Sequence, residues 1–462
     1  MVKPFWILGI DVSVQNRVGA EAYGMYYPIF GFSILLNIIL DLGITNYNNK
    51  NIAQHRQMLG RYFSGIFNVK LFLGILYMLI TLSFGYFIGY EGKEFYLLFL
   101  LGINQFLSSM ILYLRSNISG LHLFKTESIL SVMDRLLMVI ICSVLLWSDI
   151  FGGVFKIEWF VYAQFWAYLM TAIVAFAIVY QKASFFKPKI DFILFRIIIK
   201  ESMPFALLVL LMAFYYRLDS VMIERILDHG KTEAGIYAQA YRLLEGFNMF
   251  GYLFAALLLP IFARMIREHK AISDLVRTAF NLIFIPAVAI AFISWRYAEE
   301  FMDLLYLEHV AYSAEVFSLL MLSFIAIAVT YVYGTLLTAN GNLRQLNVIS
   351  LIGLIVNFSL NLWWIPIDGA VGAAKATLVT QVLVVLSQIV ISKSVFKMSY
   401  SWPYIFRLFI LFVFAIGISY YSSFYTDQFI LHSIFTGLIF VLAAFLLGLI
   451  QPKRVLLIIK KQ

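Results

Sequence analysis

The sequence has little charge for its length. Charged residues make up 13% of its 462 residues, about half of the share found in an average soluble domain. It also lacks the polar linkers that would divide a soluble chain of this length into domains, so a soluble enzyme is excluded. A net charge of +9 would suggest nucleic acid in a soluble protein. Membrane proteins, however, keep Lys and Arg in their cytoplasmic loops, and we expect no nucleic-acid partner.

The sequence is equally poor in the groups that catalyse reactions or hold cofactors. Its single cysteine, Cys142, cannot form an internal disulfide, and its 6 histidines are scattered without the spacing of a zinc site. It contains no P-loop for ATP and no G-x-S-x-G nucleophile turn. The longest predicted outer loop, 296–313, is too short for a catalytic domain. We therefore expect no metal, no cofactor and no enzymatic activity.

Long apolar runs make up most of the chain. Hydrophobic residues account for 62% of it, and the mean hydropathy is +0.89. Because a spanning helix needs roughly 20 mostly apolar residues, the sequence predicts an all-α integral membrane protein with about 13 transmembrane helices. Residues 4–10 are apolar but too few to span, so we also expect an incomplete first helix. The predicted spans lie near 22–45, 64–88, 95–114, 127–148, 159–180, 203–223, 237–262, 275–295, 314–339, 345–365, 369–392, 404–421 and 429–450.

Lys and Arg are distributed unevenly between the two sets of alternating loops. Most of them lie on the side that holds 46–63, and this bias makes that side cytoplasmic by the positive-inside rule. The C-terminus is then cytoplasmic as well. The opposite side holds only Arg17, Lys93, Lys156, Arg225, Lys231 and Arg296.

The longest cytoplasmic connection divides the chain. Residues 181–200 interleave basic and apolar side chains, which is typical of an amphipathic helix on the membrane surface. We expect this linker to join an N-terminal helical bundle, 1–180, to a C-terminal bundle, 201–392. The remainder, 393–462, is predicted to form two additional transmembrane helices and a basic cytoplasmic tail.

A weak internal repeat supports two related bundles. The segment 21–26 (EAYGMY) and the segment 233–237 (EAGIY) both enter a span after an outer loop. An aspartate precedes each copy, Asp11 in the first and Asp219 in the second. Weak internal symmetry of this kind is typical of transporters built from repeated bundles.

Ionisable residues inside the predicted spans are the candidates for function, because each is costly in lipid and must face a partner or a wet cavity. Arg242 and Glu245 share a helix face and can pair. Neighbouring Asp134 and Arg135 are expected not to face each other, and Lys375 is expected to lie unpaired in a cavity. Interhelical structural pairs and a slightly cationic cavity for an anionic cargo both remain open. The cavity candidates are Arg135, Arg217, Arg242 and Lys375; the gating or ion-coupling candidates are Asp41, Lys70, Asp134, Asp219 and Glu245.

Three short segments resemble a known family. Residues 18–26 (VGAEAYGMY), 41–44 (DLGI) and 369–374 (GAVGAA) are similar to motifs of bacterial polysaccharide-lipid flippases. These are the O-antigen, Wzx-type flippases of the multidrug/oligosaccharidyl-lipid/polysaccharide exporter superfamily. The resemblance implies two six-helix bundles around a central cavity, with two extra C-terminal helices. Lys375 departs from the family pattern, which usually has an apolar residue there.

The resemblance also implies a function. The cargo would be an undecaprenyl-pyrophosphate-linked oligosaccharide, moved from the cytoplasmic to the periplasmic leaflet of the bacterial inner membrane by ion-coupled alternating access. Membrane lipids, a polysaccharide polymerase and chain-length machinery would be its partners. Two alternatives stay open: a drug/ion antiporter of the same superfamily, and an integral-membrane polysaccharide-processing enzyme.

Overall fold

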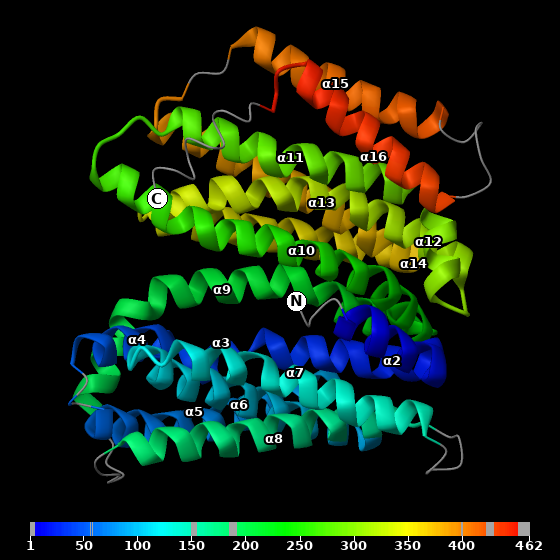
Figure 1. The fold of residues 1–462 in the computed structure, drawn as a ribbon. Helices are drawn as coiled ribbons and strands as arrows, with labels where there is room; N and C mark the ends of the chain where they lie inside the picture. The colour runs from blue at the N-terminus through cyan, green and yellow to red at the C-terminus, as the bar shows by residue number, and fades with distance from the viewer. Residues whose placement is uncertain are drawn as a thin grey trace. The chain divides into compact units, whose positions relative to one another are not determined.

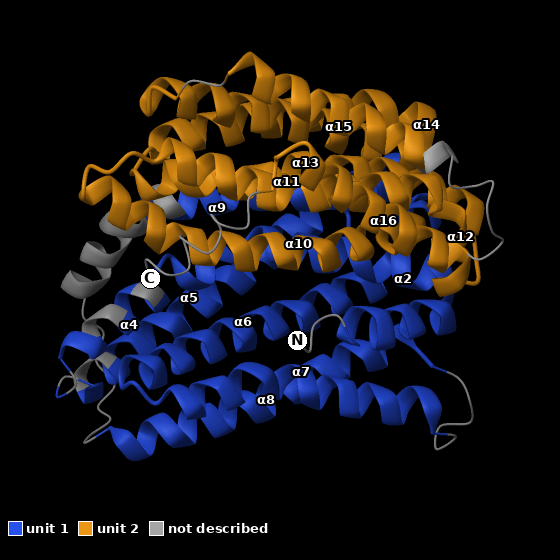
Figure 2. Cartoon of the chain, turned by 45° about the horizontal axis from the view of Figure 1, so that its top comes forward, with its two compact units in different colours: residues 1–235 blue, residues 236–462 orange. Residues whose placement is uncertain are grey.

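The protein is helical throughout the residues that its structure, a computed structural model, describes. These are residues 5–55, 57, 59–148, 155–183, 192–398, 401–421 and 429–450, and they contain no strand. Figure 1 shows the helices as long, mostly parallel or antiparallel rods within each half of the chain. The chain divides into two compact units, residues 1–235 and 236–462, which Figure 2 colours separately.

Unit 1 is built around one central helix, α6 (Gly92–Gly120), which packs against α2, α4, α5, α7 and α8. Its core is apolar and includes Phe63, Tyr113 and Leu114. The other elements are the π-helix η1 (Trp6–Asp11), α2 (Val12–Leu35), α3 (Ile38–Asp41), α4 (Ile44–Gln54), α5 (Leu59–Ile88), α7 (Phe124–Trp147), α8 (Ile157–Lys182), α9 (Phe192–Ile226) and the first residues of α10 (Gly230–Arg267).

Unit 2 is built around α13 (Val310–Ala339), which packs against α11, α12 and α14. The last two helices, α15 and α16, pack against α11 and against each other. After the remainder of α10, the elements in chain order are α11 (Ser273–Arg296), α12 (Ala298–Leu305), α13, α14 (Leu343–Val395), α15 (Trp402–Tyr421) and α16 (Phe429–Leu446). The basic tail predicted at the C-terminus, 451–462, lies outside the described residues.

The helix α14 contains two of the predicted spans. Its backbone leaves helical geometry at Gly369, where φ is 59° and ψ is −134°, a conformation that residues with a Cβ rarely adopt. Three residues later the two halves come close together, because a Cβ on Gly372 would lie 2.3 Å from the carbonyl oxygen of Trp364. The small residues of the GAVGAA segment therefore allow the helix to break at Gly369 and its two halves to pack closely at Gly372.

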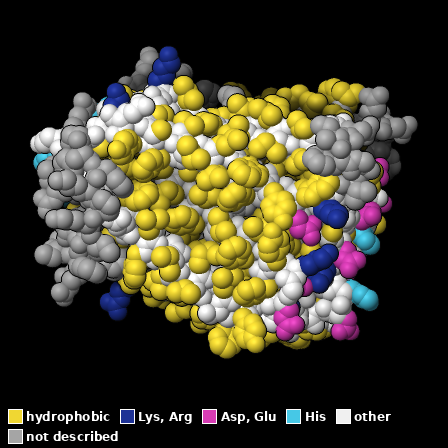
Figure 3. Space-filling view, turned by 90° about the horizontal axis from the view of Figure 1, so that it is seen from below, with side chains coloured by type: hydrophobic (Ala, Val, Ile, Leu, Met, Phe, Trp, Pro, Cys, Tyr) yellow, Lys and Arg dark blue, Asp and Glu magenta, His cyan; other side chains and the backbone are white. Residues whose placement is uncertain are grey.

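The helices have the length and surface of membrane spans. Among the described residues, 10 helices are long and apolar enough to cross a bilayer. Side chains such as Phe72, Ile75 and Leu79 on α5 are exposed although they are large and apolar, as expected for a surface that contacts lipid. Figure 3 shows one face as a broad apolar surface with charged side chains gathered at its margins. The predicted all-α membrane fold is confirmed.

The first predicted span and the loop before it are displaced. The sequence predicts an outer loop before residue 21, but residues 11–21 are helical apart from a break at Gly19, where φ is 81°. Gln15 in this segment is buried, and its Nε2 donates to the carbonyl oxygen of Gly235 at 2.9 Å. At the other end the helix stops at Leu35 rather than near residue 45. Hydrogen bonding inside the unit thus overrides the polar signal of the sequence.

The division of the chain also differs from the predicted linker. Residues 192–200 continue without interruption into α9, so this part is not a separate surface helix, and 184–191 lie outside the described residues. The helix α9 packs on α2. Along the chain, the boundary between the two compact units falls between residues 235 and 236.

The break at Gly369 yields a stability prediction. Gly369→Ala should destabilise the protein by about 1–3 kcal/mol, because alanine is strained at this backbone conformation. Gly417→Ala in α15 is the matched control, since a Cβ there meets nothing within 4 Å, and alanine favours a helix over glycine. Thermal unfolding of the purified protein in detergent measures both. Equal stability of the two variants would contradict the conclusion that the backbone at Gly369 requires glycine.

Candidate functional site

Lys70 is a buried intramembrane charge of unit 1 with several hydrogen-bond partners. Its side chain is 1% exposed, and its Nζ contacts the Asp41 Oδ1 at 2.6 Å, the Leu40 carbonyl oxygen at 2.9 Å and the Ser109 Oγ at 3.0 Å. A lysine ammonium has three N–H donors, so each has an acceptor. Lys70 therefore fastens the end of α3 to α5 and α6.

Asp41, the partner of Lys70, also orders the chain that follows it. Its carboxylate accepts hydrogen bonds from the backbone N–H of Thr45 at 3.3 Å and from the hydroxyl of Thr45, in the first turn of α4. Leu42 and Gly43 between them have positive φ values of 45° and 81°. One ion pair thus holds the break between α3 and α4 at its position in the bundle. The sequence placed Asp41 and Lys70 among the charges near the cytoplasmic side, and the structure brings them together.

Polar side chains continue from this pair along the interior of unit 1. The Asn37 Nδ2 donates to the Gln105 Oε1 at 2.9 Å, and the Gln105 Nε2 donates to the Ser33 Oγ at 3.4 Å. The Tyr77 hydroxyl donates to the Ser33 carbonyl oxygen at 2.6 Å. These residues come from α2, α5, α6 and the turn after α2, so the polar interior joins α2 to the helices α5 and α6 that Lys70 also joins.

Arg217, on α9, lies beside an aromatic stretch of α2. Its Nη1 is 3.5 Å from the Tyr27 hydroxyl, and its Cζ is 6.0 Å from the centre of the Phe30 ring, within reach of a cation–π interaction. The guanidinium is half-buried, whereas Asp219 two residues later is 1% exposed. The stretch of α2 continues through Tyr23 and Tyr26, whose rings are 5.5 Å apart. Arg217 is therefore a cation beside a buried stretch of α2 that carries aromatic rings and hydroxyls.

Asp134 and Arg135 correct a prediction about neighbouring residues. They were expected not to face each other, but the Arg135 Nε lies 3.9 Å from the Asp134 Oδ2. Adjacent side chains on a helix diverge, yet the long arginine side chain reaches back toward the carboxylate. The pair is partly exposed, with side chains 29% and 18% accessible, so its contribution to stability is small.

In unit 2 the pair expected from its spacing is present. The Arg242 Nη1 lies 2.9 Å from the Glu245 Oε2, and both side chains are largely buried. Spacing of three places them on one face of α10. This prediction is confirmed.

Lys375 corrects the second prediction, that of an unpaired ammonium. Its Nζ lies 2.7 Å from the Asp368 Oδ2. Asp368 stands immediately before the break at Gly369, and the change of direction there brings its carboxylate to the following half of α14. Asp368 is absent from the predicted site residues because it lies beyond the predicted end of the span 345–365. A search for carboxylates seven residues away across a glycine would have found it.

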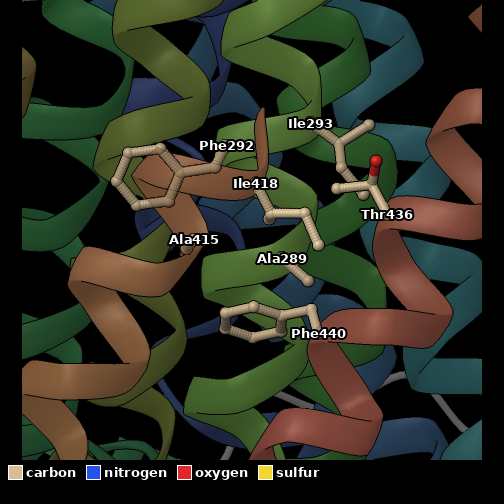
Figure 4. Close-up of a pocket in the computed structure, with 7 residues that line it drawn as sticks. All are labelled: Ala289, Phe292, Ile293, Ala415, Ile418, Thr436 and Phe440. Atoms are coloured by element: carbon tan, nitrogen blue, oxygen red, sulfur yellow. The ribbon is translucent and has the colours of Figure 1, made fainter. Parts of the chain in front are cut away.

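An apolar crevice in unit 2 is too small for a cargo. Seven residues of α11, α15 and α16 line it, and it has no room for a water molecule (Figure 4). The single polar atom in the lining is the hydroxyl of Thr436. It does not fit a sugar or a pyrophosphate. Among the described residues, no group of three or more His, Cys, Asp or Glu side chains is placed to hold a metal ion.

Comparison with known proteins identifies the chain. The model of the polysaccharide biosynthesis protein family matches residues 10–266, more than half of the sequence. The chain belongs to the polysaccharide biosynthesis protein family. An uncharacterized membrane protein of Methanocaldococcus jannaschii is 25% identical over 392 residues, which cover 80% of this chain and 89% of that protein.

Two solved structures share the fold of this chain. The lipid II flippase MurJ in an inward closed conformation matches with a TM-score of 0.69 and 16% identity, over 95% of this chain and 97% of MurJ. An inward-facing multidrug transporter of the MATE family matches with a TM-score of 0.66 and 12% identity, over 85% of this chain and 94% of that one. The protein therefore has the fold of multi-pass transporters and flippases.

The Lys70–Asp41 pair yields the prediction of this section. Lys70→Met should destabilise the protein by about 3 kcal/mol, because it removes the cation from a largely buried carboxylate and an acceptor network. The double variant Lys70→Met/Asp41→Asn should recover most of this loss, since asparagine is neutral and still accepts from Thr45. Thermal unfolding in detergent measures each variant. Single and double variants of equal stability would show that the pairing does not matter.

Proposed function

We propose that this protein is a flippase for a lipid-linked oligosaccharide unit of a surface polysaccharide, such as an O-antigen or another lipopolysaccharide component. The cargo is an undecaprenyl-pyrophosphate carrier with its attached sugars, moved from the cytoplasmic to the periplasmic leaflet of a bacterial inner membrane. The C-terminus lies in the cytoplasm in this proposal, as the distribution of Lys and Arg favours. Family membership and the flippase fold support it.

The environment of Arg217 is the observation that carries the proposal. A half-buried guanidinium in a membrane helix is costly unless it has a protein partner, binds an anion or lines a wet space. Arginine matches phosphate oxygens with paired donors. The Phe30 ring beside it is partly exposed and suits the apolar face of a sugar. In this proposal Arg217 binds the pyrophosphate, with Phe30 against the adjoining sugar.

Three further predicted cations lie beside carboxylates. Arg135, Arg242 and Lys375 lie near Asp134, Glu245 and Asp368 respectively. An anionic cargo competes with each carboxylate for its cation, so these pairs exchange partners as the cargo passes. In the absence of cargo, the paired carboxylates keep the net charge of the cavity close to zero. When the cations leave their carboxylates for the cargo, the cavity presents positive charge.

Ion coupling is assigned to the intramembrane carboxylates. Asp41, Asp134, Asp219 and Glu245 are the candidates to carry the coupling ion or to act as gates, and Lys70 sets the charge beside Asp41. Alternating access then follows from rocking of the first repeat against the second. A polymerase and chain-length machinery on the outer side receive the translocated unit.

A drug antiporter is the rival that shares the fold. The MATE transporter has a similar structure, but the family match is to polysaccharide biosynthesis proteins. A drug antiporter confers resistance to cationic drugs, whereas a flippase does not. Drug susceptibility of a strain lacking the gene separates the two functions.

Replacing the cavity cations tests the proposal. Arg217→Gln should lower surface polysaccharide by about tenfold or more, because it removes a charge-assisted contact to the cargo, and Arg217→Lys should restore part of it. Arg242→Gln should also lower it. Complete lipid-linked units should accumulate on the inner leaflet, as measured by chromatography of lipid extracts at equal protein level.

The matched control is Arg264→Gln. Arg264 is 58% exposed at the end of α10 and pairs with Glu268, so its loss should leave polysaccharide near the wild-type amount. Wild-type polysaccharide in both the Arg217→Gln and Arg242→Gln strains would contradict the cationic cavity. Wild-type polysaccharide in the deletion strain would contradict the function itself.

A further inference from the structure

A cluster of charged side chains joins two turns at one end of unit 1. The turn between α5 and α6 contributes Tyr90 and Glu94, and the end of α9 with the start of α10 contributes Glu224, Arg225 and Lys231. Glu94 is the centre: its Oε2 lies 2.8 Å from the Arg225 Nη2, and its Oε1 lies 2.7 Å from the Lys231 Nζ. By the distribution of basic residues, this end of the unit faces the outside of the cell.

Tyr90 completes the cluster. The Arg225 guanidinium stacks 4.0 Å from the centre of its ring, and its hydroxyl donates to the Glu224 Oε2 at 3.1 Å. The Arg225 Nε lies 3.8 Å from the same carboxylate. Burial raises the pKa of Tyr90 well above its ordinary value, which keeps the hydroxyl a donor at physiological pH.

A close backbone contact lies beside the cluster. A Cβ on Gly24 would lie 1.7 Å from the Lys231 carbonyl oxygen, and a Cβ on Gly235 would lie 2.0 Å from the Ala20 carbonyl oxygen. Gly24 and Gly235 occupy corresponding places in the two copies of the repeat. The start of α10 thus touches α2 through two repeat-related glycines. Lys231 takes part in both contacts, with its backbone against Gly24 and its side chain on Glu94.

Both contacts join elements of different repeats, and both are suited to separation. Arg225 is 28% exposed and Lys231 is 42% exposed, so water can replace their bonds to Glu94. Such exposed ion pairs are individually weak. The glycines carry no side chains to withdraw. Parting them also breaks the hydrogen bond from the Gln15 Nε2 to the Gly235 carbonyl oxygen. A permanent joint of this size would instead be expected to interlock large apolar side chains.

We propose that Glu94, Arg225 and Lys231, with the Gly24–Gly235 contact, form an outer latch that closes the outer end of the transport path and opens once in each cycle. This inference rests on the proposed function, because it names the gate of the same transport path. Elements of the first repeat, α2 and the α5–α6 turn, are held by the latch to the α9–α10 turn of the second. Releasing the latch lets the α9–α10 turn move away from them.

The distance across the latch tests it without any cargo. Spin labels at Lys93→Cys and Asp228→Cys, both exposed and outside the latch, are introduced in a Cys142→Ala background because Cys142 is the single native cysteine. Pulsed electron resonance in proteoliposomes should show a short and a long distance. Glu94→Gln should raise the ratio of long to short on the order of fivefold, since Glu94 holds two weak ion pairs. A single short distance that Glu94→Gln leaves unchanged would overturn the proposal.

Locking the latch tests its part in transport. Glu94→Cys and Lys231→Cys joined by a bifunctional thiosulfonate reagent should stop polysaccharide export, and reduction should restore it. The control pair is Arg264→Cys and Glu268→Cys, which replaces another ion pair but bridges a single element. Full export by the cross-linked latch pair would overturn the inference. Absence of a polysaccharide defect in the deletion strain would instead overturn the proposed function, while the spin-label distances would still decide whether the latch opens.

Discussion

Each charge placed inside the bilayer needs a partner or a water-filled cavity. Lys70 shows this constraint, because its three donors are matched by a carboxylate and a carbonyl of α3 and a hydroxyl of α6. Leaving one of those donors without an acceptor in a medium without water is expensive. The break between α3 and α4, and the packing of both on α5 and α6, depend on this one group. The same constraint explains why Arg242 and Lys375 have carboxylates beside them.

Glycine imposes a second constraint on the fold, because it determines where helices can bend or come into contact. Gly369 permits the break that turns α14 into two spans, and Gly24 permits contact between α2 and the start of α10. A bundle with satisfied charges and two such contacts can hold one arrangement firmly and still exchange it for another. Interfaces of this kind are the ones that transporters use to change state.

Much of this architecture could be predicted from the sequence, since apolar run length and the distribution of Lys and Arg report directly on the bilayer. Arg242–Glu245 was also predictable, because three residues bring two side chains to one helix face. The pairing of Lys375 with Asp368 was not, because it depends on the direction of the chain after Gly369. The helical segment around Gln15 was missed for a similar reason: its acceptor is the backbone of Gly235, 220 residues away. Periodicity describes a single helix, whereas these contacts depend on how helices are joined.

Direct observation of lipid translocation tests the central claim. The purified protein is reconstituted in vesicles with a labelled undecaprenyl-pyrophosphate oligosaccharide, and a glycosidase that cannot cross the membrane is added outside. The account predicts that the enzyme digests the whole labelled pool when the protein is present, and only the outer-leaflet portion in empty vesicles. An inner-leaflet pool that stays protected in both preparations, across an imposed ion gradient of either direction, would contradict it.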